Sequence, residues 1–198
     1  VRRAIMAAMQ VELSCEYYKT GTCQPIDWPM SKVGWAYPST SDNGHSYTRW
    51  EELPQNVQNQ TYVTTISKIK QLMAEGGVSE GDSELKIKFT IAGSSITEHP
   101  TYSVFKQAAD ILNKCGWQVE VVPDSQALVK LSTGALAVWA AAWGSTVDPD
   151  MYQVYSPYST ATSVKAWGYH QILSNSTQYS YEYDILFNRT EGNGSLAD

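Results

Sequence analysis

The sequence predicts an α/β fold with a mainly parallel sheet flanked by helices, and three observations lead to it. Residues 85–91 alternate between apolar side chains and lysines, with the period of a strand. Residues 100–115 carry apolar side chains at helical spacing, and a second strand pattern starts at Trp117. Residues 135–143 form an uncharged apolar run, which is typical of a strand buried on both faces. Strands and helices that alternate in this way build a parallel sheet.

Two helices and a long irregular segment precede the first strand. Residues 1–13 have helical spacing, and the apolar side of this helix consists of Ala4, Ala8, Val11 and Cys15. Residues 17–53 carry glycines and prolines between tryptophans and tyrosines, and a loop of this length is often functional. Residues 61–75 form the second helix, and Gly76 and Gly77 stop it. One face of the second helix holds Tyr62, Ile66, Ile69 and Met73.

Residues 85–122 read as strand, helix and strand. The first strand points Leu85, Ile87, Phe89 and Ile91 to one side. A polar loop over 92–99 follows it, and Pro100 is expected at the first position of the helix. Gly116 ends that helix, whose buried face consists of Val104, Ala108, Ile111, Leu112 and Cys115. Such a crossover gives two parallel strands with a right-handed connection.

A shorter helix and the apolar strand complete the pattern. Ser125 is expected to cap a short helix that holds Ala127, Leu128 and Leu131 and closes at Gly134. The strand over 135–143 then places Trp139 in the core and delivers Trp143 to the surface at its carboxyl end. From residue 151 onward the pattern weakens, and one further helix is expected over 181–187.

Charge and cysteine content exclude several classes of protein. The chain of 198 residues has a net charge of −6, from 14 Lys and Arg against 20 Asp and Glu, with no basic block. A nucleic-acid or anionic-membrane partner therefore lacks its electrostatic footprint. The three cysteines do not have metal-site spacing. Cys15 and Cys23 are close enough in sequence to pair in an oxidising compartment, and the alternative is free thiols, with Cys115 on the apolar face of a helix.

No catalytic or cofactor motif is present. The chain lacks a nucleophile elbow, a phosphate-binding loop, a dinucleotide fingerprint and a zinc-protease motif. His45, His99 and His170 are scattered and have no motif partner, and Asp148-Pro149-Asp150 is typical of a turn. We therefore expect neither an enzyme nor a bound cofactor or metal.

Binding is the better hypothesis, because ligands bind at the carboxyl ends of parallel strands. Three loops would meet there, over residues 94–99, 124–126 and 143–148. Their hydroxyl, amide and aromatic side chains can hold a polar ligand without reacting with it. The alternative is that these loops are only solvated turns.

Several segments, in order, resemble one family. They are the opening Val-Arg-Arg-Ala-Ile-Met-Ala-Ala-Met, residues 18–38 with their Gly-Thr-Cys-Gln-Pro, residues 86–122, and Trp143-Gly144 followed by Asp148-Pro149-Asp150. In this order and spacing the chain resembles the extracellular solute-binding proteins of the peptide, dipeptide and nickel class (family 5), which serve ABC importers.

The resemblance implies a periplasmic-binding-protein-like (type II) lobe with long irregular segments. Family members have two lobes that close on the ligand, and the order of elements here matches the second. Residues 1–198 would then be a single domain, with the first lobe before residue 1 and resuming after residue 198. The resemblance also implies an extracytoplasmic protein, lipid-anchored through a residue outside this chain, whose partners are a peptide ligand and the permease subunits of the importer.

The candidate ligand-binding residues are Trp143, Ser145, Thr146, Asp148, His99 and Tyr152. Peptide binders of the family place an acid just after the strand-end Trp, to pair with the α-amino group of the peptide. That position is Thr146 here, so the resemblance does not imply recognition of a free amino terminus. A longer or blocked peptide is the leading ligand. An oligosaccharide, stacked on residues such as Trp35 and Trp143, and a regulatory module that reuses this lobe are the alternatives.

Overall fold

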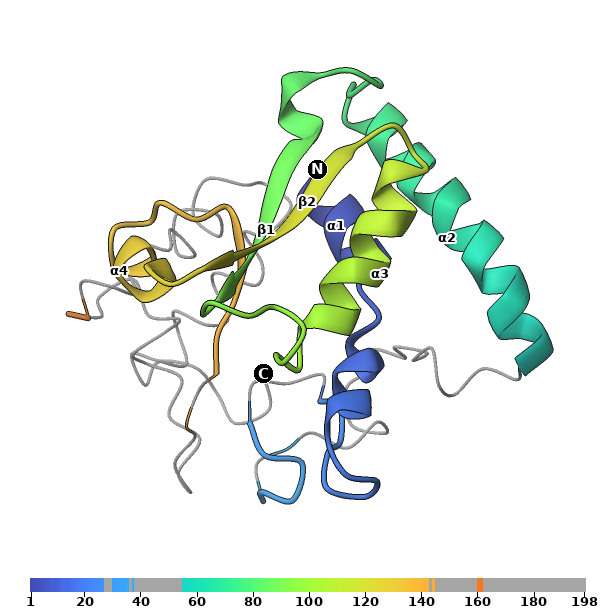
Figure 1. The fold of residues 1–198 in the computed structure, drawn as a ribbon. Coiled ribbons are helices and arrows are strands. Elements are labelled where there is room, and N and C mark those ends of the chain that lie inside the picture. The colour runs from blue at the N-terminus through green and yellow to red at the C-terminus, as the bar shows by residue number, and fades with distance from the viewer. Residues whose placement is uncertain (27–29, 36, 38–54, 143, 145–159, 162–198) are drawn as a thin grey trace, which may run out of the picture. The chain divides into compact units, whose positions relative to one another are not determined.

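The structure, a computed structural model, describes residues 1–26, 30–35, 37, 55–142, 144 and 160–161, and for 55–64 it describes only the backbone. The chain divides into two compact units. The first comprises residues 1–125 and 137–142, and the second comprises 126–136 and 143–198. Figure 1 traces the chain, and each unit is described by itself below.

The first unit contains a three-stranded sheet with β1 (Lys86–Ala92) at its centre. β2 (Gln118–Asp124) and β3 (Val138–Ala140) flank it, in the order β2-β1-β3. Both pairings are parallel, and Phe89 of β1 lies opposite Val121 of β2 and Val138 of β3. These observations confirm the predicted α/β class with a parallel sheet.

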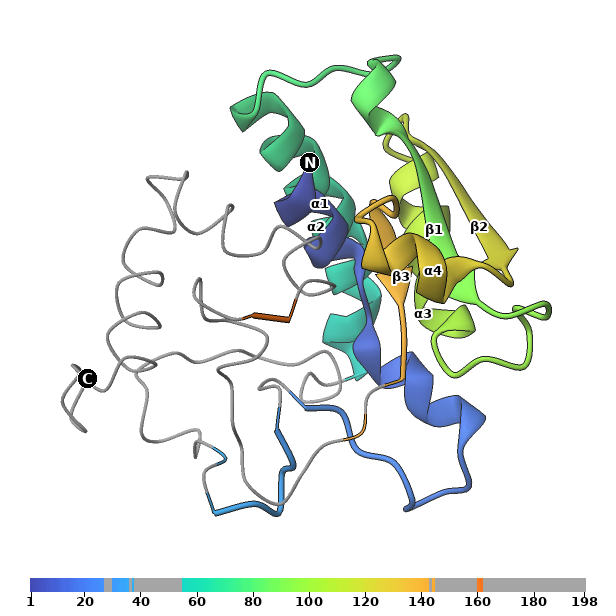
Figure 2. The ribbon, with the colours of Figure 1, turned by 90° about the vertical axis from the view of Figure 1, so that its left-hand side faces the viewer.

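The alternation of β1 decides which face of the sheet is buried. Phe89 and Ile91 are fully buried, whereas Lys86 and Lys88 are exposed. Figures 1 and 2 show α1, α2 and α3 together on one side of the sheet. Their apolar faces form one core with the strands, whose largest fully buried side chains are Phe89, Ile69, Leu85, Ile91, Ile111 and Leu112. Burial of apolar surface is the main stabilising contribution to such a core.

Helix α3 (Tyr102–Asn113) connects β1 to β2. The predicted buried face is confirmed, since Val104, Ala108, Ile111, Leu112 and Cys115 are all buried. The predicted start at Pro100 is wrong. His99 N–H donates to the carbonyl of Ile96, and Tyr102 N–H donates to the carbonyl of His99, so a turn precedes the helix and Thr101 is its N-cap.

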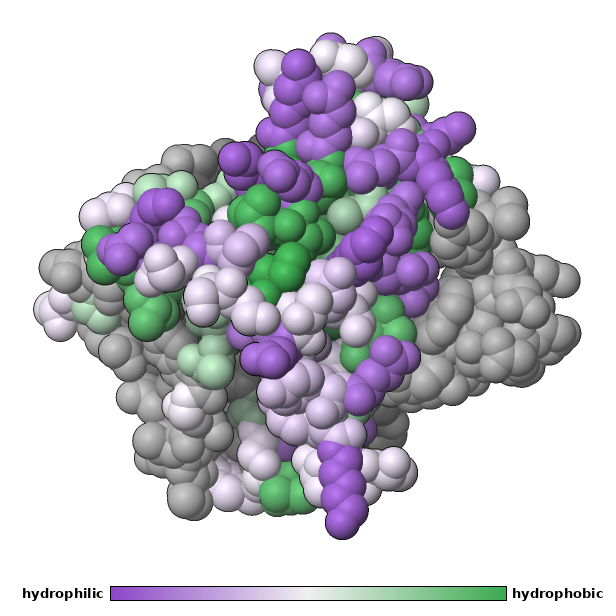
Figure 3. Space-filling model, viewed as in Figure 1, coloured by the Kyte–Doolittle hydropathy of each residue, from purple (hydrophilic) through white to green (hydrophobic). Residues whose placement is uncertain are grey.

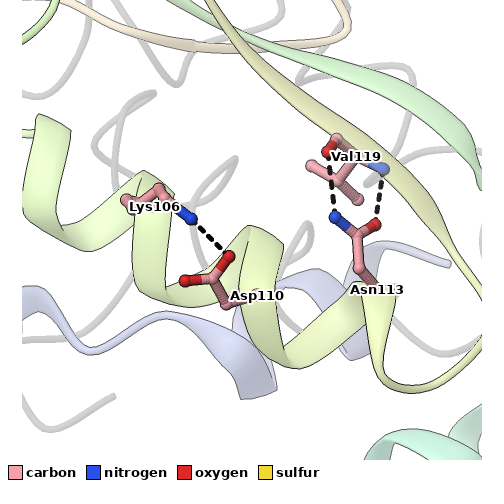
Figure 4. Close-up of polar contacts among 4 residues, drawn as sticks. All are labelled: Lys106, Asp110, Asn113 and Val119. Atoms are coloured by element: carbon pink, nitrogen blue, oxygen red, sulfur yellow. Dashed lines mark hydrogen bonds and ion pairs between the residues drawn. The ribbon is translucent and has the colours of Figure 1, made fainter.

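The end of α3 is tied to the free edge of β2. The amide of Asn113 donates to the Val119 carbonyl at 3.1 Å and accepts from the Val119 N–H at 2.7 Å (Figure 4). The backbone groups of Val119 therefore point away from β1, and by alternation so does the backbone of Pro123. Proline has no N–H to leave unpaired, which suits this edge position. On the exposed side of α3, Lys106 pairs with Asp110 one turn later.

The amino-terminal helix is shorter than the sequence predicts. α1 (Arg2–Ala8) ends at Met9, whose backbone is extended, and a 3₁₀ helix, η1 (Val11–Tyr17), follows. Ala4, Ile5 and Ala8 are buried as expected, but Val11 is exposed. The apolar spacing continues through this break, and no glycine or proline marks it, so periodicity alone carries the predicted helix too far.

Helix α2 (Gln55–Glu75) confirms the predicted second helix and its stop, but it begins before the predicted start at residue 61. Ile69 and Met73 are buried in the core, and Ile66 packs against it. At the end, Val78 N–H donates to the Met73 carbonyl across the two glycines, which is a Schellman closure. A short 3₁₀ turn, η3 (Ser83–Leu85), then leads into β1.

In the second unit, the described segment is mainly α4 (Ala127–Ser132). The helix holds the three predicted apolar residues, of which Ala127 and Leu131 are buried and Leu128 is 70% exposed. Leu128 follows Ala127 directly and so lies about 100° around the helix from it. The N-cap is Gln126 rather than Ser125, and no side chain caps the helix.

The third strand is also shorter than predicted. Residue Ala135 donates its N–H to the Lys130 carbonyl, so it belongs to the closing turn of α4 and cannot begin a strand. Only Val138–Ala140 pairs with β1, and all three residues are half-buried rather than buried on both faces. Trp139, expected in the core, is half-buried too. The helix expected over 181–187 lies outside the described residues.

Candidate binding edge

The candidate site lies where β1 and β3 end, at the carboxyl edge of the sheet. The chain passes from β1 to β2 on one side, and β3 pairs with β1 on the other side. The strand order therefore reverses at β1. In parallel sheets of this order, ligands bind beside the carboxyl end of the reversing strand, between it and the third strand.

The loop that leaves β1 begins with Gly93, Ser94 and Ser95. Gly93 N–H donates to the Asp124 carbonyl at 3.1 Å, which ties the start of the loop to the end of β2. Ser94 and Ser95 are exposed. Because the backbone below them is held by β2, two hydroxyl groups are presented to solvent at a fixed edge of the sheet. Hydroxyl groups both donate and accept hydrogen bonds, which suits an uncharged polar ligand.

His99 closes the same loop and is held by the turn before α3. Its Nδ1 accepts a hydrogen bond from the Thr101 N–H at 3.1 Å. An accepting Nδ1 carries no proton, so in the neutral ring the proton is on Nε2. The ring is half-buried. His99 therefore has one nitrogen engaged by the backbone and offers the other as a hydrogen-bond donor.

The charge state of His99 follows from its burial. Burial lowers the pKa of the imidazole from its ordinary value of 6.5, because the charged form loses solvation. His99 is therefore neutral at pH 7. Glu98, the residue before His99, is exposed to solvent. The loop offers hydroxyl and imidazole groups rather than a fixed cation.

The other sequence-predicted site residues lie outside the described residues. They are Trp143, Ser145, Thr146, Asp148 and Tyr152. In sequence they follow β3, whose carboxyl end is beside that of β1. Of the six, the structure places only His99, and it places it on the loop that leaves the reversing strand.

A shallow depression lies at the opposite end of the strands. It is lined by Lys86, Ile87, Lys88, Gln118, Val119 and Glu120. Figure 3 shows hydrophilic residues above a hydrophobic band on this face of the molecule. Lys88 lies opposite Glu120 in the register, so the two signs of charge offset each other. The depression is open and shallow, and it is distant along the strands from the loop that carries His99, so we do not assign it to the same site.

Two further features bear on chemistry. In the part of the chain that the structure describes, no three His, Cys, Asp or Glu side chains gather closely enough to hold a metal ion. The three cysteines, Cys15, Cys23 and Cys115, are free thiols. The sequence left open a Cys15–Cys23 disulfide and free thiols, and the structure has the free thiols, with Cys115 buried.

The comparisons with known proteins give no relative. The chain matches no protein-family model, no curated protein and no solved structure. Among the described residues, the helices are too short or too polar to cross a bilayer.

Proposed function

We propose that this chain is the ligand-binding lobe of an extracytoplasmic solute-binding protein that delivers peptides, chiefly oligopeptides, to an ABC importer. The observation that supports the proposal is the strand order β2-β1-β3, with all strands parallel. This order puts the carboxyl ends of β1 and β3 at one edge, together with the start of the loop that leaves β1. That edge is where the resemblance places the ligand.

The chemistry of the described loop suits a peptide backbone. Ser94, Ser95 and the neutral His99 supply hydrogen-bond donors and acceptors without a net charge. Peptide carbonyl and N–H groups are matched by such partners, whatever the side chains of the peptide. The first lobe, which is not part of this chain, would close over the ligand from the other side, and the importer would recognise the closed form. The protein would be held outside the cytoplasm by an anchor beyond this chain.

Calorimetric titration with peptide mixtures tests the proposal. We expect weak binding to this chain alone and tighter binding when the other lobe is present, because enclosure supplies most of the contacts. Peptides with blocked amino termini should bind as well as free ones, since Thr146 stands where an acid is expected. If no peptide binds and an oligosaccharide or a metal chelate does, the peptide assignment is wrong.

Two variants of His99 locate the site. His99→Ala removes both ring nitrogens and should weaken peptide binding about tenfold, the contribution of one hydrogen bond. His99→Asn keeps an acceptor for the Thr101 N–H, so it separates the support of the loop from contact with ligand. Lys86→Gln, at the opposite end of β1, is the matched control and should bind like the unmodified chain. Equal binding by all three variants would remove His99 from the site.

An oligosaccharide ligand is the second candidate, and one observation favours it. The indole of Trp35 is 84% exposed. Exposed aromatic rings of this size often mark binding surfaces, and sugars stack on them. Trp35→Ala and Trp143→Ala should abolish binding of an oligosaccharide but only weaken binding of a peptide. The same titrations on both variants distinguish the two ligands.

A further inference from the structure

The turn before α3 is closed by a side chain that can gain a proton. Nδ1 of His99 accepts the Thr101 N–H at 3.1 Å. Thr101 is the N-cap of α3, and within the described chain its own side chain makes no cap hydrogen bond. Pro100, between the two, has no N–H to contribute. The imidazole therefore supplies the acceptor that joins the end of the loop to the start of the helix.

Hydrogen bonds hold the loop that leaves β1 at both of its ends. At the start, Gly93 N–H donates to the Asp124 carbonyl at 3.1 Å. At the end, His99 N–H donates to the Ile96 carbonyl at 3.3 Å, and the His99 ring accepts the Thr101 N–H. The exposed serines of the binding edge lie between these two ends. The bond at the start joins backbone groups, which do not titrate, whereas the last bond depends on the charge state of an imidazole.

Three features of this position require an uncharged ring. An added proton turns the accepting Nδ1 of His99 into a donor that faces the Thr101 N–H. The ring is half-buried, so its charged form loses solvation. The amino end of α3 also carries the positive partial charge of the helix dipole, which disfavours a cation beside it. Protonation therefore breaks the hydrogen bond and favours a ring that has turned toward water.

The charged and titratable groups near the loop do not offset this cost. Glu98 precedes His99 on the loop and is exposed to solvent, and Asp124 lies where β2 holds Gly93. Figures 1 and 2 show η1 beside the end of α3 that the loop enters. The titratable side chains of η1, and those of α1, which also packs against α3, are Glu12, Cys15, Glu16, Tyr17, Arg2 and Arg3. Burial lowers the pKa of His99, and no charge in the described part of the chain adds to this shift.

We propose that His99 is a pH-sensitive latch of the binding edge: when Nδ1 gains a proton, the hydrogen bond to Thr101 breaks, the end of the loop is released, and the edge holds its ligand less tightly. The loss of ligand affinity rests on the proposed function, whereas the release of the turn is a property of this chain whatever it binds. Because burial holds the pKa of the folded ring below 6.5, the release occurs at a pH below that value.

Amide hydrogen exchange of the ¹⁵N-labelled chain, measured by NMR, tests the release. The ring nitrogen shifts of His99, identified by their loss in His99→Asn, report its protonation as pH falls from about 8 to about 5. The protection factor of the Thr101 N–H, corrected for the intrinsic pH dependence of exchange, should fall about tenfold in step with that protonation, which corresponds to one hydrogen bond. Gly93 N–H, at the other end of the loop, should keep its protection.

His99→Asn is the matched variant, because asparagine keeps an acceptor for the Thr101 N–H and does not titrate. In this variant the protection of Thr101 should not depend on pH. The latch is overturned if Thr101 stays protected while the His99 ring titrates. It is also overturned if Thr101 and Gly93 lose protection together, because the whole unit would then be unfolding.

Calorimetric titration tests the effect on ligand affinity. The probe is a mixture of acetylated and amidated five-residue peptides without ionisable side chains, so that the ligand itself does not titrate. Affinity should fall about tenfold between the pH at which the His99 ring is neutral and the pH at which it is protonated, and His99→Asn should show no such fall. If no peptide binds at either pH, the proposed function fails, and the exchange of Thr101 still decides the latch. Equal affinities at the two pH values would show that the latch does not regulate this site.

Discussion

Helix α3 follows β1 and helix α4 follows β2. Both helices carry valine and leucine, but they differ in how many of these side chains are buried. α3 buries six of its twelve residues, including Ile111 and Leu112. α4 buries two of its six residues, while Leu128 and Val129 of the same helix are 70% and 62% exposed. The same apolar residue types are therefore core in one helix and surface in the other.

The length of a helix accounts for this difference. In α3 the apolar positions recur over three turns, so only one face satisfies all of them. In α4 fewer than two turns are available, and any of several faces satisfies the pattern. An apolar residue in a short helix is therefore weak evidence of burial. The predictions below test this contrast, from the largest expected effect to the smallest.

Truncation of one leucine in each helix gives the largest contrast. Leu112 is fully buried, so Leu112→Ala should destabilise the fold by about 3 kcal/mol through lost burial and a cavity. Leu128→Ala, the same chemical change at an exposed site, should cost less than about 0.5 kcal/mol. Urea denaturation of both variants, with a common slope, measures the difference. Comparable losses from the two variants would show that α4 is buried in solution.

The second largest contrast is expected between the polar residues at the ends of the two helices, whose removal should change stability by different amounts. Asn113 reaches out of α3 to both backbone groups of Val119, whereas the Ser132 hydroxyl donates to the Val129 carbonyl within α4. Asn113→Ala would leave the Val119 groups unpaired at the edge of the sheet and should cost about 2 kcal/mol. Ser132→Ala should change stability by only a few tenths of a kcal/mol.

A matched variant separates the two hydrogen bonds of Asn113. Asn113→Asp keeps the acceptor for the Val119 N–H but places a carboxylate near the Val119 carbonyl, with no donor for it. Its stability should therefore also fall. Unpaired strand edges promote association, so light scattering should show Asn113→Ala forming larger species that the unmodified chain does not form. If Asn113→Ala is as stable and as monodisperse as Ser132→Ala, Asn113 does not protect the edge.

The parallel unit over 85–122 could be predicted because several signals agree there. Leu85, Phe89 and Ile91 alternate with lysines, and Gly116 marks the end of a helix with a long apolar face. Where a prediction depended on a single sequence feature, it was wrong. Periodicity alone extended the first helix past Ala8, and apolar content alone began the third strand at residue 135. Ala135 instead donates to the Lys130 carbonyl, a tertiary detail that its own side chain does not indicate.

The binding edge could be predicted as a place, but only in part as a set of contacts. Parallel topology fixes which ends of the strands meet, so the sequence predicts that the loop after β1 lies at the carboxyl edge of the sheet. The neutral state of His99 was not predictable, because it depends on burial and on the Thr101 N–H.

Alanine at the glycine that closes each helix should cost a similar amount of stability in α3 and α4. The two helices would then differ in burial but not in how they end. Gly116 has a φ of 88° after α3, and Gly134 has a φ of 69° after α4. Alanine at either position would be strained and should cost about 1 kcal/mol. Gly116→Ala should be slightly the worse, because its Cβ would lie 2.5 Å from Glu80 Cγ, which must move. Thermal denaturation should rank both between Leu112→Ala and Leu128→Ala, and a neutral Gly134→Ala would show that α4 is not ordered in solution.

The smallest expected effect is at the start of α3. His99 accepts the Thr101 N–H there, while no side chain caps α4. Burial lowers the pKa of His99 in the folded chain below its ordinary value of 6.5, which applies to the unfolded chain. The unfolded chain therefore binds the proton first as pH falls. The stability that this ring contributes is complete above pH 6.5 and declines as pH falls from there to the folded pKa.

His99→Asn isolates this contribution, because asparagine keeps an acceptor for the Thr101 N–H and does not titrate. Urea midpoints measured from about pH 8 to about pH 5 should fall more steeply for the unmodified chain than for His99→Asn. His45 and His170 are present in both proteins, so their titration cancels in the comparison. Parallel curves would mean that the ring is solvated in the folded chain and that the turn before α3 does not bury it. A steeper curve for His99→Asn would reverse the sign and place a carboxylate beside the imidazole instead.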